Sequence, residues 1–424
     1  MLNGASNMSK KQFMKLFAIL FIAVFVSAAI LYSPASALIS QNVTSWFWTS
    51  DTNVAAVATG DVNGDGTNEI VTAGQFNDGT NWNAQLIVWN PSNLVAEKVT
   101  SFKWNDTQIS SVAVANISGG TGLDIVTGGS FFDGNRWNAQ LIVWNGTTLV
   151  AERVTTWFWT SDTEISSVAV ANVTGGSSLD IVTGGAFFDG TRWNSQLIVW
   201  NASTLVAEKV TTWYWTSNTY INSVAVANIT GGTSLSIVTG GTFNDGNRNN
   251  AQLIVWNGPT LAVQSLTSWF WTSDTEINSI VVANVTEGHA LSIITGGDFL
   301  DNTRSNAQLI VWNGSTLAVQ TLTSWFWTSD TKVASVAVSN ITGGTSLDIL
   351  TAGTFNDGLR NNAQIIEWNG STTVANSVAT WFTTSDTGAN SVAIANFGLV
   401  GNRIVVGGSY FDSIRSVGQL TIWR

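Results

Sequence analysis

The chain repeats itself with a period of 55 or 56 residues, and this repeat constrains the fold more than any other feature. The phrase Leu-Ile-Val-Trp-Asn or a close variant of it recurs seven times. Its tryptophans are Trp89, Trp144, Trp200, Trp256, Trp312, Trp368 and Trp423. A second phrase, Thr-Ser-Trp-Phe-Trp-Thr-Ser-Asp-Thr at residues 44–52, returns in modified form in the later units. A fixed period of this size is typical of repeat architectures, in which each unit is one supersecondary module.

Each unit contains four short segments with strand character. In the second unit they are Ser111–Asn116, Leu123–Gly129, Ala139–Trp144 and Val150–Trp159. Clusters of Gly, Asn, Asp and Ser separate them, and no segment has a helical period, so four β-strands are predicted. The first three are almost continuously apolar, which is typical of strands buried on both faces. Four-stranded units that pack on identical neighbours describe the blades of an all-β fold, the β-propeller.

The two ends of the repeat predict how the ring closes. After residue 37 the chain starts with an isolated fourth strand, Val43–Trp48, and it stops at Arg424, after the third strand of the last unit. If the N-terminal strand completes the last blade, no seam stays open between the first and last blades. We therefore expect residues 38–424 to form a seven-bladed β-propeller with four antiparallel strands per blade.

Residues 1–37 have the pattern of an export signal. Three lysines precede an apolar run over residues 16–32, and the small-residue triplet Ala35-Ser36-Ala37 follows. The expectation is a signal peptide cleaved before Leu38, which would give a secreted or cell-surface protein with no membrane insertion after cleavage. The alternative is an uncleaved anchor, because the 17 residues of the apolar run are just enough to span a bilayer.

Charge and residue-type counts exclude several functions. Residues 38–424 carry 13 basic and 27 acidic side chains, a net charge of −14, because three of the 16 basic residues lie in the first 37. A strongly acidic exported chain is a poor partner for nucleic acid. The absence of cysteine excludes disulfides, thiol nucleophiles and Cys-ligated metals. His289 is the only histidine, so a Ser-His-Asp triad has little support, and we expect no enzyme activity.

One loop of the first unit has the spacing of a metal site. Oxygen-bearing side chains alternate along it, Gly66 permits a sharp turn, and an acidic side chain closes the run. The candidate ligands are Asp61, Asn63, Asp65, Thr67 and Glu69. Hard oxygen ligands with three carboxylates suit Ca²⁺, so one structural calcium ion is predicted. The alternative is a metal-free turn rich in Asp and Asn.

This loop resembles the calcium loop of the FG-GAP/VCBS propeller repeats, the family of the integrin α-subunit head. The blade pattern is similar to that family over residues 38–424, whereas the Asp-x-Asn-x-Asp-Gly signature occurs only once. The resemblance implies the propeller fold and the position of the calcium loop. The family usually has Asp where Glu69 stands. No particular function is implied, because these propellers are mostly binding platforms.

Asn-x-Ser/Thr motifs predict that the two faces of the ring differ. The candidate glycosylation sites are Asn42, Asn105, Asn116, Asn145, Asn172, Asn201, Asn228, Asn284, Asn313, Asn340 and Asn369. Nine of them lie in the loops between strands one and two or three and four, which we expect on one face, with Asn42 leaning toward it. The opposite face, which we call the bare face, carries only Asn105. The alternative is that these asparagines serve turn chemistry without sugar.

The loop between strands two and three, on the bare face, repeats polar residues. An Asp recurs in all seven units and an Arg in six, while three units add a tryptophan. The candidate ligand-binding residues are Asp78, Asp133, Asp189, Arg136, Arg192, Trp82, Trp137 and Trp193. The alternative is that Arg–Asp pairs pin the loops and the tryptophans pack locally. The other 19 of the 22 tryptophans are repeated positions expected in the core or between blades.

These features predict a non-catalytic binding or adhesion protein that recognises glycans or a surface glycoprotein through the bare face. The first alternative is a structural surface-layer, sheath or matrix component that associates laterally. The second is a glycan-degrading enzyme with two carboxylates. It is disfavoured because the adjacent arginines should lower the carboxyl pKa values too far for a general acid.

Overall fold

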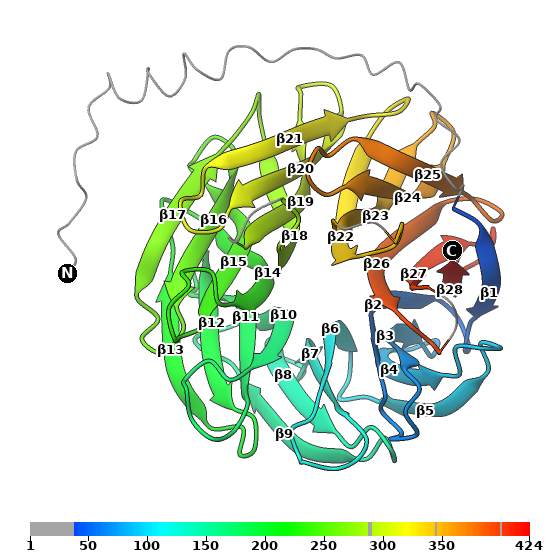
Figure 1. The fold of residues 1–424 in the computed structure, drawn as a ribbon. Coiled ribbons are helices and arrows are strands. Elements are labelled where there is room, and N and C mark those ends of the chain that lie inside the picture. The colour runs from blue at the N-terminus through cyan, green and yellow to red at the C-terminus, as the bar shows by residue number, and fades with distance from the viewer. Residues whose placement is uncertain (1–37, 287–290, 344–345, 399–400) are drawn as a thin grey trace. The chain divides into compact units, whose positions relative to one another are not determined.

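The computed structural model describes residues 38–286, 291–343, 346–398 and 401–424. These residues form seven antiparallel four-stranded sheets arranged around a common axis (Figure 1). The predicted all-β fold, a seven-bladed propeller, is confirmed. Nowhere in the described ranges is there a helix long and apolar enough to cross a membrane. The predicted signal peptide and its cleavage site lie outside the described residues.

Every blade has the same strand order from the axis outward. The innermost strands are β2 (Thr52–Gly60), β6 (Thr107–Ala115), β10 (Thr163–Ala171), β14 (Thr219–Ala227), β18 (Thr275–Ala283), β22 (Thr331–Ser339) and β26 (Thr387–Ala395). The second strands are β3 (Glu69–Asn77), β7 (Asp124–Phe132), β11 (Asp180–Phe188), β15 (Ser236–Asn244), β19 (Ser292–Leu300), β23 (Asp348–Asn356) and β27 (Arg403–Phe411). The third strands are β4 (Trp82–Trp89), β8 (Trp137–Trp144), β12 (Trp193–Asn201), β16 (Asn249–Asn257), β20 (Ser305–Asn313), β24 (Asn361–Asn369) and β28 (Ser416–Trp423). The outermost strands are β5 (Ala96–Phe102), β9 (Ala151–Trp157), β13 (Ala207–Trp213), β17 (Val263–Trp269), β21 (Val319–Trp325), β25 (Ala375–Trp381) and β1 (Ser40–Trp46).

The ring closes as predicted, through the strand nearest the N-terminus. β1 pairs antiparallel with β28, from Ser40 opposite Trp423 to Trp46 opposite Gly418. The last blade is therefore built from both ends of the propeller (Figure 1). The closing strand lies a few residues earlier than the predicted Val43–Trp48.

The same shift appears in the other blades. In the second blade β6 begins at Thr107 rather than at Ser111, and β9 ends at Trp157 rather than at Trp159. The chain turns at this point because the backbone N–H of Trp159 donates to Oγ1 of Thr163, 3.0 Å away, instead of continuing the ladder. The last two aromatic residues of each Trp-Phe-Trp phrase therefore lie in the loop to the next blade.

Burial on both faces holds for the second and third strands but not for the innermost ones. β8 is buried along almost its whole length, whereas β6 is mostly half-buried. Innermost strands have a sheet neighbour on one side only, so their other edge faces the axis. A serine from the preceding blade covers one N–H there, as in Val168 N to Ser111 Oγ at 3.1 Å. Val57 N to Ser391 Oγ, at 3.0 Å, makes the same contact across the closure.

Aromatic rings hold the blades together near the rim. At each junction the last residue of an outermost strand packs on the tryptophan that ends the strand-three phrase of the next blade. The ring centroids are 4.6–5.3 Å apart in the pairs Trp46–Trp89, Phe102–Trp144, Trp157–Trp200, Trp213–Trp256, Trp269–Trp312, Trp325–Trp368 and Trp381–Trp423. The predicted packing between blades is confirmed for these tryptophans.

Candidate binding surface

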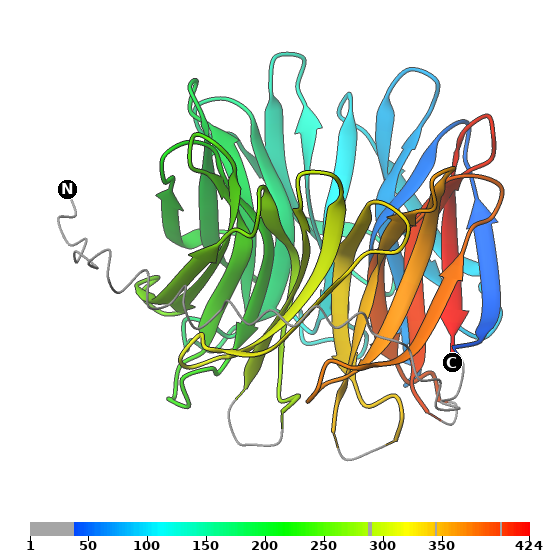
Figure 2. The ribbon, with the colours of Figure 1, turned by 90° about the horizontal axis from the view of Figure 1, so that it is seen from above.

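The loops separate onto two faces in the predicted manner (Figure 2). We name each loop by the strands it joins, so the four–one loop runs from the outermost strand of one blade to the innermost strand of the next. Hydrogen bonds join the loops of one face: Nη1 of Arg192 in a two–three loop lies 3.4 Å from the carbonyl oxygen of Thr216 in a four–one loop. Asn105 lies in a four–one loop, on the bare face. Nδ2 of Asn42 lies 3.5 Å from the carbonyl oxygen of Ser92 in a three–four turn, so Asn42 leans toward the opposite face as expected.

The repeated aspartates of the bare face cap their own turns. Oδ1 of Asp133 accepts hydrogen bonds from the backbone N–H groups of Asn135 and Arg136, at 2.8 and 2.9 Å. The carboxylates of Asp78 and Asp189 cap their turns in the same way. These backbone donors hold the pKa of Asp133 below its usual range, and the nearby Arg136 charge contributes less. The predicted direction is confirmed, but its main cause is the turn rather than the arginine. Such carboxylates are poor general acids.

Each repeated arginine lies over an aromatic ring of the four–one loop in its own blade. The guanidinium carbon of Arg136 is 4.4 Å from the centroid of Phe158, and that of Arg192 is 4.5 Å from Tyr214. The remaining pairs are Arg248–Phe270, Arg304–Phe326, Arg360–Phe382 and Arg415–Phe47. A guanidinium over a ring face is a favourable cation–π contact. These pairs tie the two loops of the bare face together.

In the first blade, other residues stand at both positions of this arginine–aromatic pair. Asn81 stands in the arginine position and Lys103 in the aromatic position. Nζ of Lys103 lies 3.0 Å from Oδ2 of Asp78, so the positive charge reaches the two–three turn from the other loop. This arrangement keeps a positive charge between the two loops of this blade, which favours the pinning interpretation of the repeated arginines, and a ligand-binding role for them stays a prediction.

The three predicted loop tryptophans do not supply the rings that the arginines cover. Trp82, Trp137 and Trp193 are the first residues of their strands and are half-buried. The Trp137 ring packs 5.8 Å from Phe132, and the Trp193 ring lies 5.8 Å from Tyr220 of the next blade. Arg136 and Arg192, which precede Trp137 and Trp193 in the chain, instead contact the aromatic rings of the four–one loops. The tryptophan contacts favour local packing, and a ligand-binding role for the tryptophans stays a prediction.

The exposed tryptophans are ones that the sequence pattern assigned to the core or the blade junctions. Trp48, Trp104, Trp159, Trp215 and Trp327 are 37–50% exposed. Each lies in a four–one loop and packs on a phenylalanine of the next blade, as Trp159 does on Phe187 with 5.8 Å between centroids. One signal in the sequence could have revealed their exposure. The sixth unit has Thr383 in this position, and a core tryptophan site would not accept threonine.

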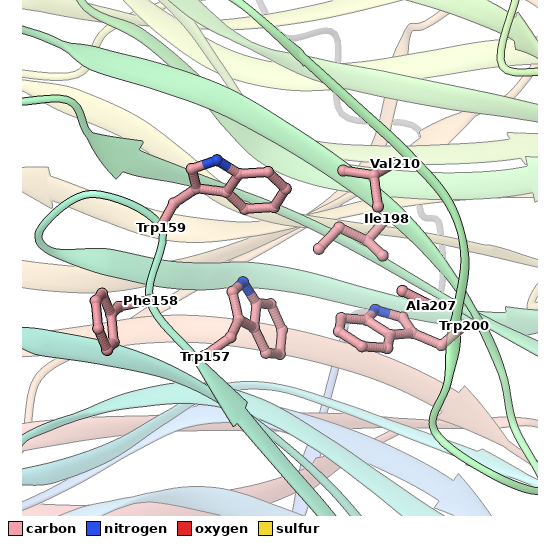
Figure 3. A pocket seen from close by; sticks show the side chains of 7 residues that line it. All are labelled: Trp157, Phe158, Trp159, Ile198, Trp200, Ala207 and Val210. Atoms are coloured by element: carbon pink, nitrogen blue, oxygen red, sulfur yellow. The ribbon is translucent and has the colours of Figure 1, made fainter.

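A groove runs between the second and third blades, from the exposed Trp159 to the outermost strand of the third blade. Its volume is about 390 Å³, and it is lined by Trp157, Phe158, Trp159, Ile198, Trp200, Ala207 and Val210. Trp157 and Trp159 project toward Ile198 and Val210, whereas Phe158 points the other way (Figure 3). The alternation of a Trp-Phe-Trp phrase thus gives two indoles to the groove and the central ring to the arginine.

A second groove occupies the equivalent place between the sixth and seventh blades. Its volume is about 250 Å³, and Thr383 stands where the first groove has Trp159. The Thr383 hydroxyl accepts a hydrogen bond from Nε2 of Gln419 at 2.9 Å. In the first groove Oε1 of Gln196 accepts from Nε1 of Trp157 at 2.9 Å, while its buried Nε2 has no partner among the described residues.

Four of the five predicted calcium ligands lie in the loop after β2 and Glu69 begins β3, and their carboxylates accept hydrogen bonds from neighbouring donors. The Asp61 carboxylate accepts from the N–H groups of Gly64 and Gly66, at 2.6 and 2.8 Å. Nδ2 of Asn63 donates to Oδ2 of Asp65 and Oε1 of Glu69, at 3.1 and 3.0 Å. Thr67 donates its backbone N–H to Oδ1 of Asp65.

As they lie, these side chains form a hydrogen-bonded turn. No group of three or more acidic or histidine side chains is placed to hold a metal ion within the described ranges. Oε2 of Glu69 accepts from the N–H of Val62 at 3.0 Å, as Asp124 does from Ile117 in the second blade. Calcium binding stays a prediction, and it requires the Asn63 amide to turn its oxygen toward Asp65 and Glu69.

Calcium removal tests this prediction. If the loop binds Ca²⁺ only when folded, a 100-fold excess over Kd stabilises the protein by about 2.7 kcal/mol. Thermal unfolding in calcium should then occur at a higher temperature than in chelator, and Asp65→Asn should reduce the difference. Equal midpoints in calcium and chelator, with no binding heat, would leave the loop as a metal-free turn.

The asparagines of the one–two loops have a structural role. Oδ1 of Asn116 accepts from the N–H of Gly119 at 2.8 Å, and the Ser118 hydroxyl donates to the Asp124 carboxylate at 2.9 Å. Both polar positions of this Asn-x-Ser motif therefore serve the loop. Asn396 caps its loop similarly although it is not in a glycosylation motif.

The asparagines of the three–four turns also have a structural role, in which the side-chain oxygen accepts and the side-chain nitrogen donates. Oδ1 of Asn145 accepts from the N–H of Thr148, and its Nδ2 donates to Glu152, each at 3.0 Å. Asn90, which is followed by proline and lies outside any motif, donates to Glu97 at 2.9 Å. These contacts support turn chemistry for the repeated asparagines, and glycosylation stays a prediction.

One acidic pair departs from the repeat. Glu276 and Asp298 lie opposite each other on β18 and β19, and Oδ2 of Asp298 is 3.5 Å from Nζ of Lys332 in the next blade. Burial, together with the Asp298 charge, raises the pKa of Glu276 to about 7. The two carboxyls thus share one cationic neighbour, and the glycan-degrading alternative stays a prediction.

The fold and this surface define a seven-bladed β-propeller with aromatic residues and arginines repeated along one face. The BBS1N chain from a crystal structure of BBS1N in complex with ARL6DN is similar in structure, with a TM-score of 0.55 and 11% identity over 92% of this chain and 97% of that one. Raptor from Chaetomium thermophilum is similar with a TM-score of 0.51 and 10% identity, over 89% of this chain and 29% of that one. These likenesses concern the fold alone. No family model matches the sequence, and no curated protein matches it.

Proposed function

We propose that this propeller is a non-catalytic binding protein of the cell surface, which recognises glycans or a surface glycoprotein through the bare face and the grooves that open beside it. The observation that carries the proposal is the set of exposed four–one loop tryptophans, of which Trp159 contributes to an aromatic groove of about 390 Å³. A concave site lined by aromatic side chains with few polar groups is typical of small-ligand binding.

The chemistry of the groove favours an uncharged ligand with flat apolar faces. All seven lining residues are apolar or aromatic. The neighbouring arginine charge is directed onto Phe158, whose ring points away from the two indoles of the groove. A sugar ring offers an apolar C–H face to an indole and hydroxyl groups to the solvent, so it suits such a site. Export through residues 1–37 would place the protein where surface glycans occur.

Two further points support an extracellular binding propeller. The loop at residues 61–69 resembles the FG-GAP/VCBS calcium loop, and we propose membership of that type of repeat together with one structural calcium ion. The similar BBS1N chain was crystallised in complex with ARL6DN, so a propeller of this shape can hold a protein partner. A surface glycoprotein would present both glycan and protein to the same face.

Residues that other blades carry at the equivalent positions provide variants that test where the ligand binds. Trp48, Trp159, Trp215 and Trp327 are changed together to threonine, the residue that stands at the equivalent Thr383. We expect at least about a tenfold loss of affinity on a glycan array or for a captured polysaccharide, because aromatic anchors dominate binding energy. The fold should tolerate threonine, since Thr383 keeps the same backbone contact to Thr387 at 3.0 Å.

A matched variant separates this surface from the loop tryptophans. Trp82, Trp137 and Trp193 are changed to asparagine, which two later blades carry at Asn249 and Asn361. The proposal expects this variant to keep most of its binding. A loss confined to the asparagine variant would move the site to the two–three loops. No binding by the unaltered protein to any glycan or glycoprotein would contradict the proposal itself.

A further inference from the structure

The outermost strands present seven sheet edges to the outside of the ring. Each of β5, β9, β13, β17, β21, β25 and β1 is the last strand in its sheet. One side of its backbone therefore has no strand partner within the described residues. Proteins commonly protect such edges with charged side chains, because an unprotected edge is a template for pairing with another chain.

Charged side chains protect the outer edges of the first three blades only. The three outermost strands of the first three blades carry an acidic residue followed by a basic one, namely Glu97-Lys98, Glu152-Arg153 and Glu208-Lys209. The outermost strands of the other four blades, β17, β21, β25 and β1, contain no charged side chain. These four blades are contiguous, so the unprotected edges form one sector.

The same sector exposes apolar side chains. Val263 and Leu266 on β17 are 53% and 39% exposed, and Val319 and Leu322 on β21 are 46% and 38% exposed. The remaining residues of the two strands are polar but uncharged, apart from the tryptophan that ends each. Uncharged strands with branched apolar residues and no proline have the composition that favours strand pairing.

We propose that this uncharged sector binds the same sector of a second copy of the chain through antiparallel pairing of outermost strands, with β17 and β21 as the pairing strands. The distribution of charge favours association through the uncharged sector over the rest of the ring. Residues 38–424 carry a net charge of −14, so two copies repel each other. The repulsion is least where the facing strands hold no charge.

The geometry of edge pairing is self-complementary. An antiparallel edge offers the same alternating donors and acceptors to its own copy, so one surface serves both partners about a two-fold axis. Pairing β21 with its copy would also cover Val319 and Leu322, which are otherwise exposed. Since an adjacent blade repeats this edge, it can pair with a third copy in the same way, and the assembly would then grow laterally.

Transplanting the protective pair from the third blade tests the proposal. The substitutions Gln264→Glu with Ser265→Lys, and Gln320→Glu with Thr321→Lys, copy Glu208-Lys209 onto β17 and β21. The fold should accept them, because Gln264 and Gln320 use Oε1 to accept from Ser236 and Ser292, and a glutamate oxygen can do the same. We expect the purified protein to associate reversibly in sedimentation velocity, and the fourfold variant to weaken association by at least about tenfold.

A control removes protection at the opposite side of the ring. Glu152→Gln with Arg153→Ser should leave self-association as strong as in the unaltered protein, or strengthen it. The proposal is overturned if the unaltered protein stays monomeric at every concentration, or if the fourfold variant associates equally well. Loss of association in the tryptophan-to-threonine variant alone would also overturn it, because contact would then run through the bare face. Glycan binding by the fourfold variant shows that it is folded and separates this result from the proposed function.

Discussion

Deletion of residues 38–46 is expected to abolish cooperative unfolding of the propeller. The deletion removes β1, and with it the Trp46 ring that packs 4.6 Å from Trp89 and donates to Gln85 at 2.9 Å. It also leaves the buried strand β28 as a new sheet edge. Loss of a fully buried tryptophan costs about 3–5 kcal/mol, and removal of the half-buried Trp46 together with the whole strand costs at least as much. That reaches the lower end of the roughly 5–15 kcal/mol by which native proteins are stable.

The measurement is the unfolding transition followed by tryptophan fluorescence and near-ultraviolet circular dichroism. A rescue variant restores the strand at the other end of the chain. Residues 313–325, which hold a three–four turn and β21, are added after Trp423 in place of Arg424, so that the last blade becomes continuous. We expect this addition to recover the cooperative transition. A deletion variant with the same midpoint as the unaltered protein would show that closure by β1 contributes little.

Gly185→Ala is expected to destabilise the protein by roughly 3 kcal/mol or more, because its Cβ has no space. A Cβ at this position would lie 2.0 Å from the backbone carbonyl oxygen of Glu164. The register of β10 shifts between Ile165 and Ser167, and this bulge is where that carbonyl approaches β11. The position is glycine in every blade, namely Gly74, Gly129, Gly185, Gly241, Gly297, Gly353 and Gly408.

The preceding glycine provides a matched control. A Cβ at Gly184 would meet Cγ1 of Val224 at 2.6 Å, which is a side-chain atom that can move. Two blades already carry alanine at this position, as Ala73 and Ala352. We expect Gly184→Ala to cost about 1 kcal/mol, measured by denaturant unfolding. Equal losses in the two variants would contradict the argument from the bulge.

The repeat accounts for most of what could be predicted about the fold. Strand number, blade count and closure follow from period and position, because each unit must bury its faces against neighbours of the same sequence. The ends of strands did not follow. The Trp-Phe-Trp phrase alternates like a strand, yet the chain turns after its first tryptophan because Thr163 takes the N–H of Trp159.

The face that carries the candidate site was predictable from the sequence, whereas the exposure of its aromatic residues was not. The bare face and its repeated aspartates and arginines were identified from the sequence. The sequence pattern also placed Trp159 among the packed tryptophans and Trp137 among the ligand candidates. In the structure Trp159 is 48% exposed, whereas Trp137 packs on Phe132. Repetition shows that a residue serves every blade, but it does not show how much of its ring the neighbouring blade covers.

What the sequence by itself determined is the set of properties that repeat along the chain: the period, the four strands of each unit, the sharing of loops between two faces, and the net charge of −14. The tertiary structure decided which side chains meet across a blade junction or between loops. It placed Arg136 on Phe158 and aligned Trp157 and Trp159 along one groove. The physical reason is that spacing along the chain specifies a residue's place within its blade, whereas exposure and contact depend on the angle and distance at which the next blade packs.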